Sequence, residues 1–232
     1  MNTALILAGG VGSRMGTGTC PKQYLMLREY PVFCYCLRTF QKHLQIDDIV
    51  IVADGAWTGF IDEWLQRTGI DKFKAYAVPG EARQLSILSG LETIKALLPE
   101  TEKVIIHDAV RPFLSLELIT GCLTGLDQAA GVMPVLPMKD TCYQSRDGTH
   151  ITGYLPRSQL FAGQAPEAFR FAPYLELHHR MGAQELRQIC GSSEIAYKSG
   201  MDVLMIPGSE KNIKITTKED LVLAEKYLDG ES

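Results

Sequence analysis

Residues 5–25, LILAGGVGSRMGTGTCPKQYL, combine a glycine-rich loop with an arginine and a lysine directly after a short apolar run. Glycines let backbone N–H groups approach a phosphate closely, and Arg14 and Lys22 would add positive charge beside it. Residue types of this kind, so arranged, could hold the phosphates of a nucleotide. A tight turn that only joins a strand to a helix is the alternative, so other segments have to decide between the two.

The glycine loop fits neither of the two common phosphate-binding patterns. A dinucleotide loop needs a third small residue at position 15 after Gly10 and Gly12, and Met15 is too large for the close helix–strand contact required there. A Walker loop needs Gly-Lys-Ser/Thr, and no such triplet follows these glycines. Asp54, which follows the second apolar run, keeps a dinucleotide site open as an alternative.

Further segments that follow apolar runs also carry side chains able to do chemistry, namely PGEARQLS at 79–86, HDAVRPF at 107–113 and PMKDT at 137–141. Asp108 could hold Mg²⁺ that bridges phosphates, or accept hydrogen bonds from hydroxyl groups of a substrate. Capping of a helix that begins near Ser115 is the alternative role for Asp108. We expect His107 to be a packed histidine and not an acid or base.

The elements that must position these segments alternate along the chain. Continuous apolar runs at 4–8, 49–53, 75–78, 104–106, 132–135 and 203–206 predict strands, most of them buried on both faces. Helical patterns occupy 57–67, 82–98, 171–181, 183–196 and 218–228. This alternation predicts an α/β fold, with a mostly parallel sheet flanked by helices that binds ligands at the carboxyl ends of its strands.

Residues 138–157 interrupt the alternation. β-Prone residues flank Arg146-Asp147-Gly148, a typical hairpin turn, so we expect an arm of two strands that projects from the sheet. No internal repeat divides the sequence, and a chain of 232 residues is long enough to bury one sizeable core. We therefore expect residues 1–232 to form a single domain.

Composition limits the partners and the compartment. A formal net charge of −4 and a pI near 5.8 provide no general attraction for nucleic acid or for an anionic membrane surface. The opening residues, MNTALILAGG, lack the basic region and the long apolar run of a signal peptide or membrane span, so we expect a cytoplasmic protein. The six cysteines are scattered without a C-x-x-C pair, which disfavours a zinc site or a disulfide framework.

The glycine loop resembles one family signature, L-x-A-G-G-x-G-x-R-M followed by P-K-Q at 21–23. Three later segments match the same family in order: Gly80-Glu81-Ala82-Arg83 with Ser86, HDAVRPF at 107–113, and NIKIT at 212–216. Together with Arg157, these motifs resemble the cytidylyltransferases that act on 2-C-methyl-D-erythritol 4-phosphate and on ribitol 5-phosphate. The resemblance covers residues 4 to about 228.

This resemblance implies a fold and a reaction. The fold is a Rossmann-like sheet of the nucleotidyltransferase type with a protruding β-arm, through which two copies pair as a homodimer. The reaction is CTP plus a polyol phosphate giving a CDP-polyol and pyrophosphate, with Mg²⁺ as cofactor. An acceptor phosphate is already a nucleophile, so the protein has to align two polyanions and stabilise charge.

The resemblance also implies residue roles. Arg14, Lys22 and Lys214 would be catalytic, neutralising the triphosphate and the leaving pyrophosphate. The nucleotide would contact Leu7, Ala8, Gly9, Gly10, Gly12, Gly80, Glu81, Arg83, Ser86 and Ala109, with Ser86 and the amides near Gly80 and Glu81 at the cytosine. The acceptor would contact Asp108, Thr141, Arg157 and Gln164, with Asp108 also holding the metal and Arg157 reaching across the dimer.

Two acceptor-side segments depart from the methylerythritol-phosphate pattern. The threonine of its T-P-Q segment is Ala165 here, and a T-D-E-A-like stretch appears as ICGSSE at 189–194. We therefore expect ribitol 5-phosphate to be the acceptor in preference to methylerythritol 4-phosphate. The alternatives are a non-catalytic CTP-binding dimeric module and, ranked last because no hydride-transfer site is evident, an NAD-dependent oxidoreductase.

Overall fold

The computed structural model describes residues 1–10 and 20–230, and its centre is a mixed sheet of eight strands. The strands are β1 (Asn2–Leu7), β4 (Asp48–Val52), β5 (Phe73–Ala77), β6 (Lys103–Asp108), β7 (Gly131–Pro137), β10 (Phe161–Gly163), β11 (Glu167–Arg170) and β12 (Val203–Pro207). Their order is β10-β7-β11-β6-β1-β4-β5, and β12 also pairs with β7. Strands β4 and β6 pair with β1 in parallel, β5 pairs with β4 in parallel and β12 with β7 in parallel, whereas β10 and β11 run antiparallel to their neighbours.

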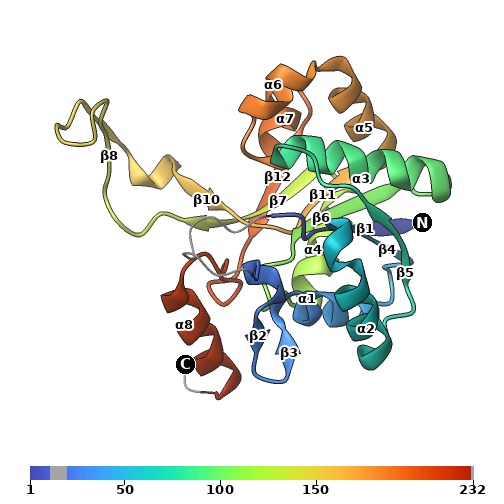
Figure 1. The fold of residues 1–232 in the computed structure, drawn as a ribbon. Helices are drawn as coiled ribbons and strands as arrows, with labels where there is room; N and C mark the ends of the chain where they lie inside the picture. Colours follow the sequence, from blue (N-terminus) through green and yellow to red (C-terminus); the bar gives the residue numbers. More distant parts are fainter. Residues whose placement is uncertain (11–19, 231–232) are drawn as a thin grey trace.

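Helices cover both faces of this sheet (Figure 1). One face carries α1 (Val32–Lys42), α2 (Thr58–Thr68) and α4 (Leu116–Gly125), and the other carries α3 (Arg83–Leu97), α5 (Phe171–Arg180), α6 (Ala183–Gln188) and α7 (Ser192–Lys198). Side chains alternate between the faces of a strand, so Ala4 and Ile6 of β1 join the first core and Leu5 joins the second. Burial on both faces explains the continuous apolar runs, and the expected α/β class is confirmed.

A smaller cluster lies below the sheet in Figure 1, where α8 (Lys218–Leu228) contacts the hairpin of β2 (Met26–Leu27) and β3 (Tyr30–Pro31). Helix α8 begins where the sequence indicates. The Thr217 hydroxyl accepts a hydrogen bond from the backbone of Asp220 (3.2 Å), and the Asp220 carboxylate accepts one from the backbone of Thr217 (2.9 Å). This reciprocal pair is a capping box, which fixes the first turn of the helix.

The predicted arm projects from the body of the molecule (Figure 1). It consists of β8 (Cys142–Gln144) and β9 (Gly153–Leu155), paired antiparallel, and leads into a 3-10 helix, η3 (Arg157–Gln159). The connection is longer than a tight hairpin turn, because the Asp147 carboxylate accepts hydrogen bonds from two backbone N–H groups beyond Gly148, which itself has a φ of 76°. Two arm tyrosines, Tyr143 and Tyr154, are exposed.

Two details of the sequence prediction are wrong. Residues 183–196 form two short helices, because Ile189 and Gly191 have extended backbone angles and the Glu194 carboxylate accepts hydrogen bonds from the N–H groups of Cys190 and Gly191. A carboxylate bound there caps a new helix and ends the previous one. The antiparallel strands β10 and β11 were not anticipated, since three- and four-residue segments are too short to show a period.

Candidate active site

The carbonyl end of β1 is fixed by two side chains that follow the glycine loop. Gln23 Nε2 donates to the carbonyl oxygens of Ala8 (2.6 Å) and Gly10 (2.8 Å), and the Tyr24 hydroxyl donates to that of Ala8 (3.0 Å). Both side chains belong to the 3-10 helix η1 (Lys22–Tyr24), and Gln23 is buried. The Pro-Lys-Gln segment therefore folds back onto the start of the loop and brings its lysine to this edge of the sheet.

The loop that follows β5 packs directly against the glycine loop. A Cβ atom at Gly9 would lie 2.4 Å from Cβ of Pro79, and one at Gly80 would lie 2.5 Å from Cβ of Leu85, so both positions require glycine. The Ser86 hydroxyl closes the turn, because it accepts from the backbone N–H of Gly80 (3.0 Å) and lies 3.3 Å from the Gly80 carbonyl. Ser86 thus fixes the backbone predicted to read a base.

A cavity of about 450 Å³, called here the first cavity, opens between these loops. This volume lies within the range of small-molecule sites. The residues that line it are Leu7, Gly9, Gly10, Lys22, Gln23, Val52, Gly80, Glu81, Ala82, Arg83, Ser86, Asp108, Val110 and Lys214. Loops from four strands and from the segment that follows β12 thus meet at one place, as the carboxyl ends of the strands of an open sheet do.

A second cavity of about 470 Å³ adjoins the first and shares Arg83, Asp108 and Lys214 with it. Its other lining residues are Arg111, Met133, Gly163, Gln164, Ala165, Glu167, Cys190, Gly191, Ser193, Glu194 and Tyr197. Both segments that depart from the methylerythritol-phosphate pattern, around 165 and around 190–192, form part of its wall. The three shared residues therefore lie between the first cavity, which glycines line, and the second cavity, whose wall differs from the methylerythritol-phosphate pattern.

Asp108 is the centre of the charges shared by the two cavities. Its Oδ1 lies 3.3 Å from Arg83 Nη2, and its Oδ2 lies 2.9 Å from Lys214 Nζ and 3.8 Å from Arg111 Nε. Burial alone would raise the pKa of Asp108, but the neighbouring charges of Arg83 and Lys214, with that of Arg111, hold its pKa well below the usual range. Asp108 therefore stays ionised at neutral pH.

His107 supports this cluster as a neutral group. The side chain is fully buried, and its Nε2 lies 3.1 Å from the carbonyl oxygen of Arg111, so Nε2 carries the proton. Burial lowers the pKa of His107 to about 4, which agrees with a packed histidine. Arg111 in turn donates through Nη1 to the carbonyl oxygen of Asn212 (2.7 Å), which ties the loop after β6 to the segment that carries Lys214.

Comparison with known proteins identifies the family. The IspD family model, described as 2-C-methyl-D-erythritol 4-phosphate cytidylyltransferase, matches residues 2–230. The chain belongs to this family. It is 29 % identical to the ribitol-5-phosphate cytidylyltransferase of Streptococcus agalactiae serotype Ia, over 99 % of this chain and 96 % of the relative. It is 33 % identical to the 2-C-methyl-D-erythritol 4-phosphate cytidylyltransferase of Geotalea uraniireducens, over 97 % of this chain and 96 % of the relative.

Solved structures agree with this assignment. The 4-diphosphocytidyl-2C-methyl-D-erythritol synthase of Anaerococcus prevotii superposes with a TM-score of 0.83 at 28 % identity, covering 98 % of this chain and 96 % of that one. The resemblance stated from the motifs is thus confirmed, and the chain is a cytidylyltransferase of the IspD family. Its relatives carry the names of two different acceptors, so family membership leaves the acceptor open.

The structure brings most of the predicted nucleotide-site residues of this IspD-family enzyme together. Leu7, Gly9, Gly10, Lys22, Gly80, Glu81, Arg83, Ser86 and Lys214 all line the first cavity. Ala8 and Ala109 are buried beside it, with the Ala109 N–H donating to the Leu7 carbonyl (3.1 Å). Gly12 and Arg14 lie outside the described residues. Asp54 does not face this site, since its carboxylate caps the 3-10 helix η2 (Gly55–Trp57).

The predicted acceptor-site residues are more dispersed. Gln164 lines the second cavity, but its amide is bound to the backbone of Ser209, donating to the carbonyl (2.9 Å) and accepting from the N–H (3.0 Å). Thr141 and Arg157 lie at the base of the arm, where Arg157 Nη1 donates to the carbonyl oxygen of Lys139 (2.8 Å). Of the four predicted acceptor-site residues, Asp108 is the one that lines both cavities. It does not cap α4, because Ser115 caps that helix.

Gln23, Glu167 and Ser192 are site residues whose roles the sequence reasoning did not assign. Gln23 was visible only as one letter of the P-K-Q match, and its role depends on carbonyl groups more than ten residues upstream. Glu167 and Ser192 both contact Arg83, at 3.6 Å and 2.6 Å respectively. For Glu167 and Ser192 the sequence did hold a signal, because they belong to the two segments that depart from the methylerythritol-phosphate pattern. Nothing in the sequence shows that these two segments meet in space.

The donor set can be tested for a metal. Among residues 1–10 and 20–230 there is no cluster of three or more His, Cys, Asp or Glu side chains able to hold a metal ion. Asp108 is a single carboxylate beside a cavity that is lined by Gly9, Gly10, Lys22 and Lys214, and magnesium in nucleotide enzymes uses one or two carboxylates with substrate phosphates and water. The residues thus fit a Mg²⁺ ion that is bound mainly by nucleotide phosphates. Asp108 would bind this ion while it also contacts Lys214.

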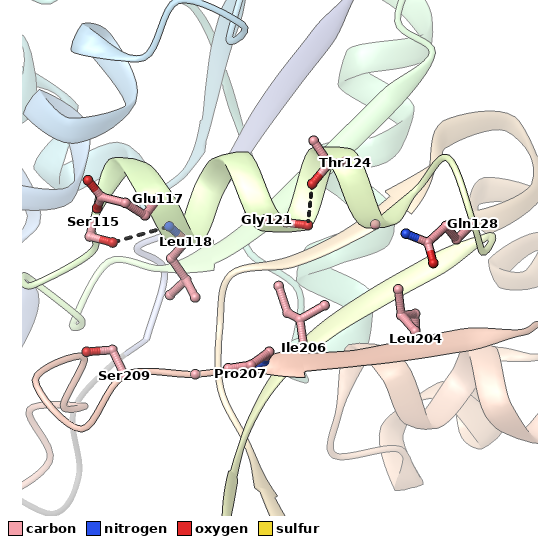
Figure 2. Close-up of a pocket in the computed structure, with 12 residues that line it drawn as sticks. Ser115, Glu117, Leu118, Gly121, Thr124, Gln128, Leu204, Ile206, Pro207 and Ser209 are labelled. Atoms are coloured by element: carbon pink, nitrogen blue, oxygen red, sulfur yellow. Dashed lines mark hydrogen bonds between the residues drawn. The ribbon is translucent and has the colours of Figure 1, made fainter.

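A third cavity, of about 450 Å³, lies between α4 and β12 (Figure 2). None of the predicted site residues lines it. The Ser115 and Thr124 hydroxyls on its α4 side are already bound within the helix, to the backbone of Leu118 and of Gly121 respectively.

No helix in the described part of the chain is long and apolar enough to span a membrane.

Proposed function

We propose that this cytidylyltransferase transfers CMP from CTP to a polyol phosphate and releases pyrophosphate, with ribitol 5-phosphate as the acceptor. One observation carries the proposal: two adjoining cavities share Arg83, Asp108 and Lys214, so that two ligands bound in them would meet at a charged boundary. Arg83, Arg111 and Lys214 are three cations facing the two carboxylates of Asp108 and Glu167, which leaves the boundary with one positive charge in excess. Such an excess suits two polyanionic substrates.

CTP occupies the first cavity in this proposal. The backbone at Gly9 and Gly10, with Gly12 and Arg14 of the same loop, binds the triphosphate together with Lys22. The cytosine lies against the Gly80–Glu81 backbone, whose conformation is held by Ser86. A slot closed by backbone excludes the larger purines by shape.

The acceptor occupies the second cavity with its phosphate towards the shared cations. A phosphate oxygen of the acceptor attacks the α-phosphorus of CTP in line, a new P–O–P bond forms, and the bond from the α-phosphorus to the bridging oxygen breaks as pyrophosphate leaves. Lys22 and Lys214 stabilise the charge that develops on the leaving group and on the α-phosphoryl oxygens. Asp108 orients Arg83 and Lys214 and accepts hydrogen bonds from acceptor hydroxyls.

Mg²⁺ belongs to the proposal as an ion that enters with the triphosphate. Asp108 would hold it on the protein side, and it would supply charge neutralisation for the phosphates. The residues of the chain bind and orient the two substrates independently of it. Because the ion would neutralise phosphate charge, turnover is nevertheless expected to depend on Mg²⁺.

Dimerisation through the arm, 138–157, is part of the same proposal. Thr141 and Arg157 lie away from both cavities of their own chain, and exposed tyrosines at 143 and 154 give the arm an apolar surface. We propose that these two residues act on the acceptor in the site of a second copy, with residues 1–232 working as one nucleotidyltransferase domain.

A cytoplasmic location is supported by six cysteines that are all free thiols.

The choice of ribitol 5-phosphate rests on the wall of the second cavity. Ala165, Cys190 and Gly191 line this cavity and stand, with the neighbouring Ser192, where the methylerythritol-phosphate pattern has residues that hold its acceptor. The lining of the first cavity keeps the shared motifs. A relative named for ribitol 5-phosphate and one named for methylerythritol phosphate match at similar identity, so methylerythritol 4-phosphate is the second candidate. A dimeric module that binds CTP without reaction is the candidate from another class.

The deciding experiment measures pyrophosphate release from CTP and Mg²⁺ with ribitol 5-phosphate and methylerythritol 4-phosphate offered separately. Lys22→Ala serves as the blank, and calorimetry reports CTP binding in parallel. We expect release with ribitol 5-phosphate at a higher kcat/KM than with methylerythritol 4-phosphate. Faster release with methylerythritol 4-phosphate would reassign the acceptor, and CTP binding without release would support the non-catalytic module.

A further inference from the structure

Glu167 is a buried carboxylate that the proposed reaction does not use. It is the first residue of β11, and its side chain is only 8 % exposed. Its Oε2 accepts two hydrogen bonds from Ser193, one from the backbone N–H (2.7 Å) and one from the hydroxyl (2.6 Å). Its Oε1 faces Arg83, 3.6 Å from Nη2. A buried charge is retained only where partners compensate it, and Glu167 has two partners from two different helices.

Arg83, the first residue of α3, lies where these contacts converge. Its Nη1 donates to the Ser192 hydroxyl (2.6 Å), and its Nη2 lies between the carboxylates of Asp108 (3.3 Å) and Glu167 (3.6 Å). The guanidinium is therefore held at Nη1 by Ser192 and at Nη2 by Asp108 and Glu167. Because a planar fork with fixed donors cannot satisfy these partners in many orientations, the three contacts together select one.

The support behind Arg83 is itself fixed. The Tyr174 hydroxyl, fully buried, donates to the carbonyl oxygen of Ser192 (3.1 Å), and Gln84 Nε2 donates to that of Gly191 (2.8 Å). The start of α7 is thus tied to α5 and α3. These contacts give Ser192 and Ser193 a defined position from which to hold Glu167 and Arg83.

We infer that Glu167 is a positioning residue that, with Ser192 and Ser193, holds Arg83 at the boundary of the two cavities. The two segments in which the sequence departs from the methylerythritol-phosphate pattern, 165–167 and 190–193, meet at this guanidinium. The two segments together form one support for Arg83. Both segments differ from the methylerythritol-phosphate pattern, and in this chain the residues that they carry hold Arg83 in place. The inference rests on the proposed function only in its prediction for turnover, since the position of Arg83 can be observed directly.

The first test uses Glu167→Gln, which keeps an oxygen for the Ser193 donors and removes the charge that faces Arg83. We expect kcat/KM for the acceptor to fall at least tenfold while the Kd for CTP changes less than threefold. Glu176→Gln on α5, which removes the same charge from an exposed pair with Arg180, is the matched control and should leave both constants unchanged. Glu167→Gln with Ser192→Asp returns a carboxylate to Arg83 from the other segment and should recover most of the loss.

Crystal structures of the wild type and of Glu167→Gln provide the second test, which needs no turnover. We expect Arg83 to leave Ser192 in the variant and to move wholly onto Asp108. If Arg83 keeps its contact with Ser192 and acceptor kinetics are unchanged, the inference is overturned. If the wild type releases no pyrophosphate, the proposed function fails, and the position of Arg83 in the two crystal structures alone upholds or overturns the role of Glu167.

Discussion

The two cavities share three residues but are built in different ways. The first is formed largely by backbone, with Gly9 and Gly80 in contacts too close for any side chain and with Gln23 and Ser86 bound to main-chain atoms. The second is formed by charged and polar side chains that come from distant parts of the chain, such as Glu167 and its partners. Changes in the first cavity should therefore act through shape, and changes in the second through charge.

The largest effect is expected at Lys22, a charged residue of the otherwise backbone-built first cavity. Lys22→Ala should lower kcat by about 10²–10³-fold, because a positioned cation that stabilises a leaving pyrophosphate contributes on this scale. Thermal unfolding should change little, since the side chain acts on substrate. Steady-state pyrophosphate release and calorimetry measure the two quantities.

Lys42→Ala, at an exposed position in the last turn of α1, is the control for loss of a lysine and should leave kcat unchanged. A fall of less than threefold in the Lys22 variant would show that the backbone donors and the other cations of the site stabilise the triphosphate without Lys22. The first cavity would then depend on the shape of its backbone more than on the charge of Lys22, in contrast to the second cavity.

Asp108 tests the boundary between the cavities through the pH dependence of stability. Its pKa is lowered in the folded protein, so its contribution is fully present above its unfolded pKa and is lost as pH falls towards the folded pKa. At pH 7, Asp108→Asn should lower the free energy of unfolding by about 3 kcal/mol, because three cations lose their shared carboxylate. Below the unfolded pKa of roughly 4 the difference between wild type and variant should shrink.

Urea unfolding of both proteins between pH 7 and pH 3 measures this difference. His107 adds to the acid sensitivity of both, because its pKa of about 4 lies below the ordinary histidine value of 6.5 and stability is lost as pH falls from about 6.5 to about 4. The charge of Asp108 itself raises the pKa of His107, so this contribution cancels only in part between the two proteins. A difference that stays constant down to pH 3 would mean that the charge of Asp108 does not stabilise the fold.

Gly80 tests the importance of shape in the first cavity. Gly80→Ala would place a Cβ 2.5 Å from Cβ of Leu85 and 2.8 Å from its backbone carbonyl carbon, so the turn must open. We expect the Kd for CTP to rise about tenfold, equivalent to about 1.4 kcal/mol. Calorimetric titration with CTP measures it. Gly59→Ala on α2, where no described atom lies within 4 Å of the added Cβ, is the control and should bind CTP as the wild type does.

The sequence predicted these two cavities unequally, for a physical reason. The glycine loop, Lys22, the Gly80 turn and Ser86 lie in short segments whose composition already indicates a backbone site after a strand. The apolar runs predicted the buried strands around this site, although not the short strands β10 and β11. The environment of Arg83 depends on Asp108, Glu167 and Ser192, which are separated by up to 109 residues from it. No local pattern reports such a meeting. The break at Ile189 between α6 and α7 has a different origin, since it depends on a carboxylate only three and four residues away from the N–H groups that it binds.

The smallest effect is expected at Gln164, a side chain of the second cavity that holds a loop. Gln164→Ala removes two hydrogen bonds to the backbone of Ser209, in the loop that leads to Lys214. A net value of about 0.5 kcal/mol for each of the two bonds, about 1 kcal/mol together, predicts a fall of roughly fivefold in kcat/KM for the acceptor. The Kd for CTP should stay within twofold, and Gln66→Ala on the exposed face of α2 should change neither constant. A loss above a hundredfold would instead place the Gln164 amide on the acceptor itself, because loosening one loop cannot remove that much, and the second cavity would then bind its ligand through more than charge.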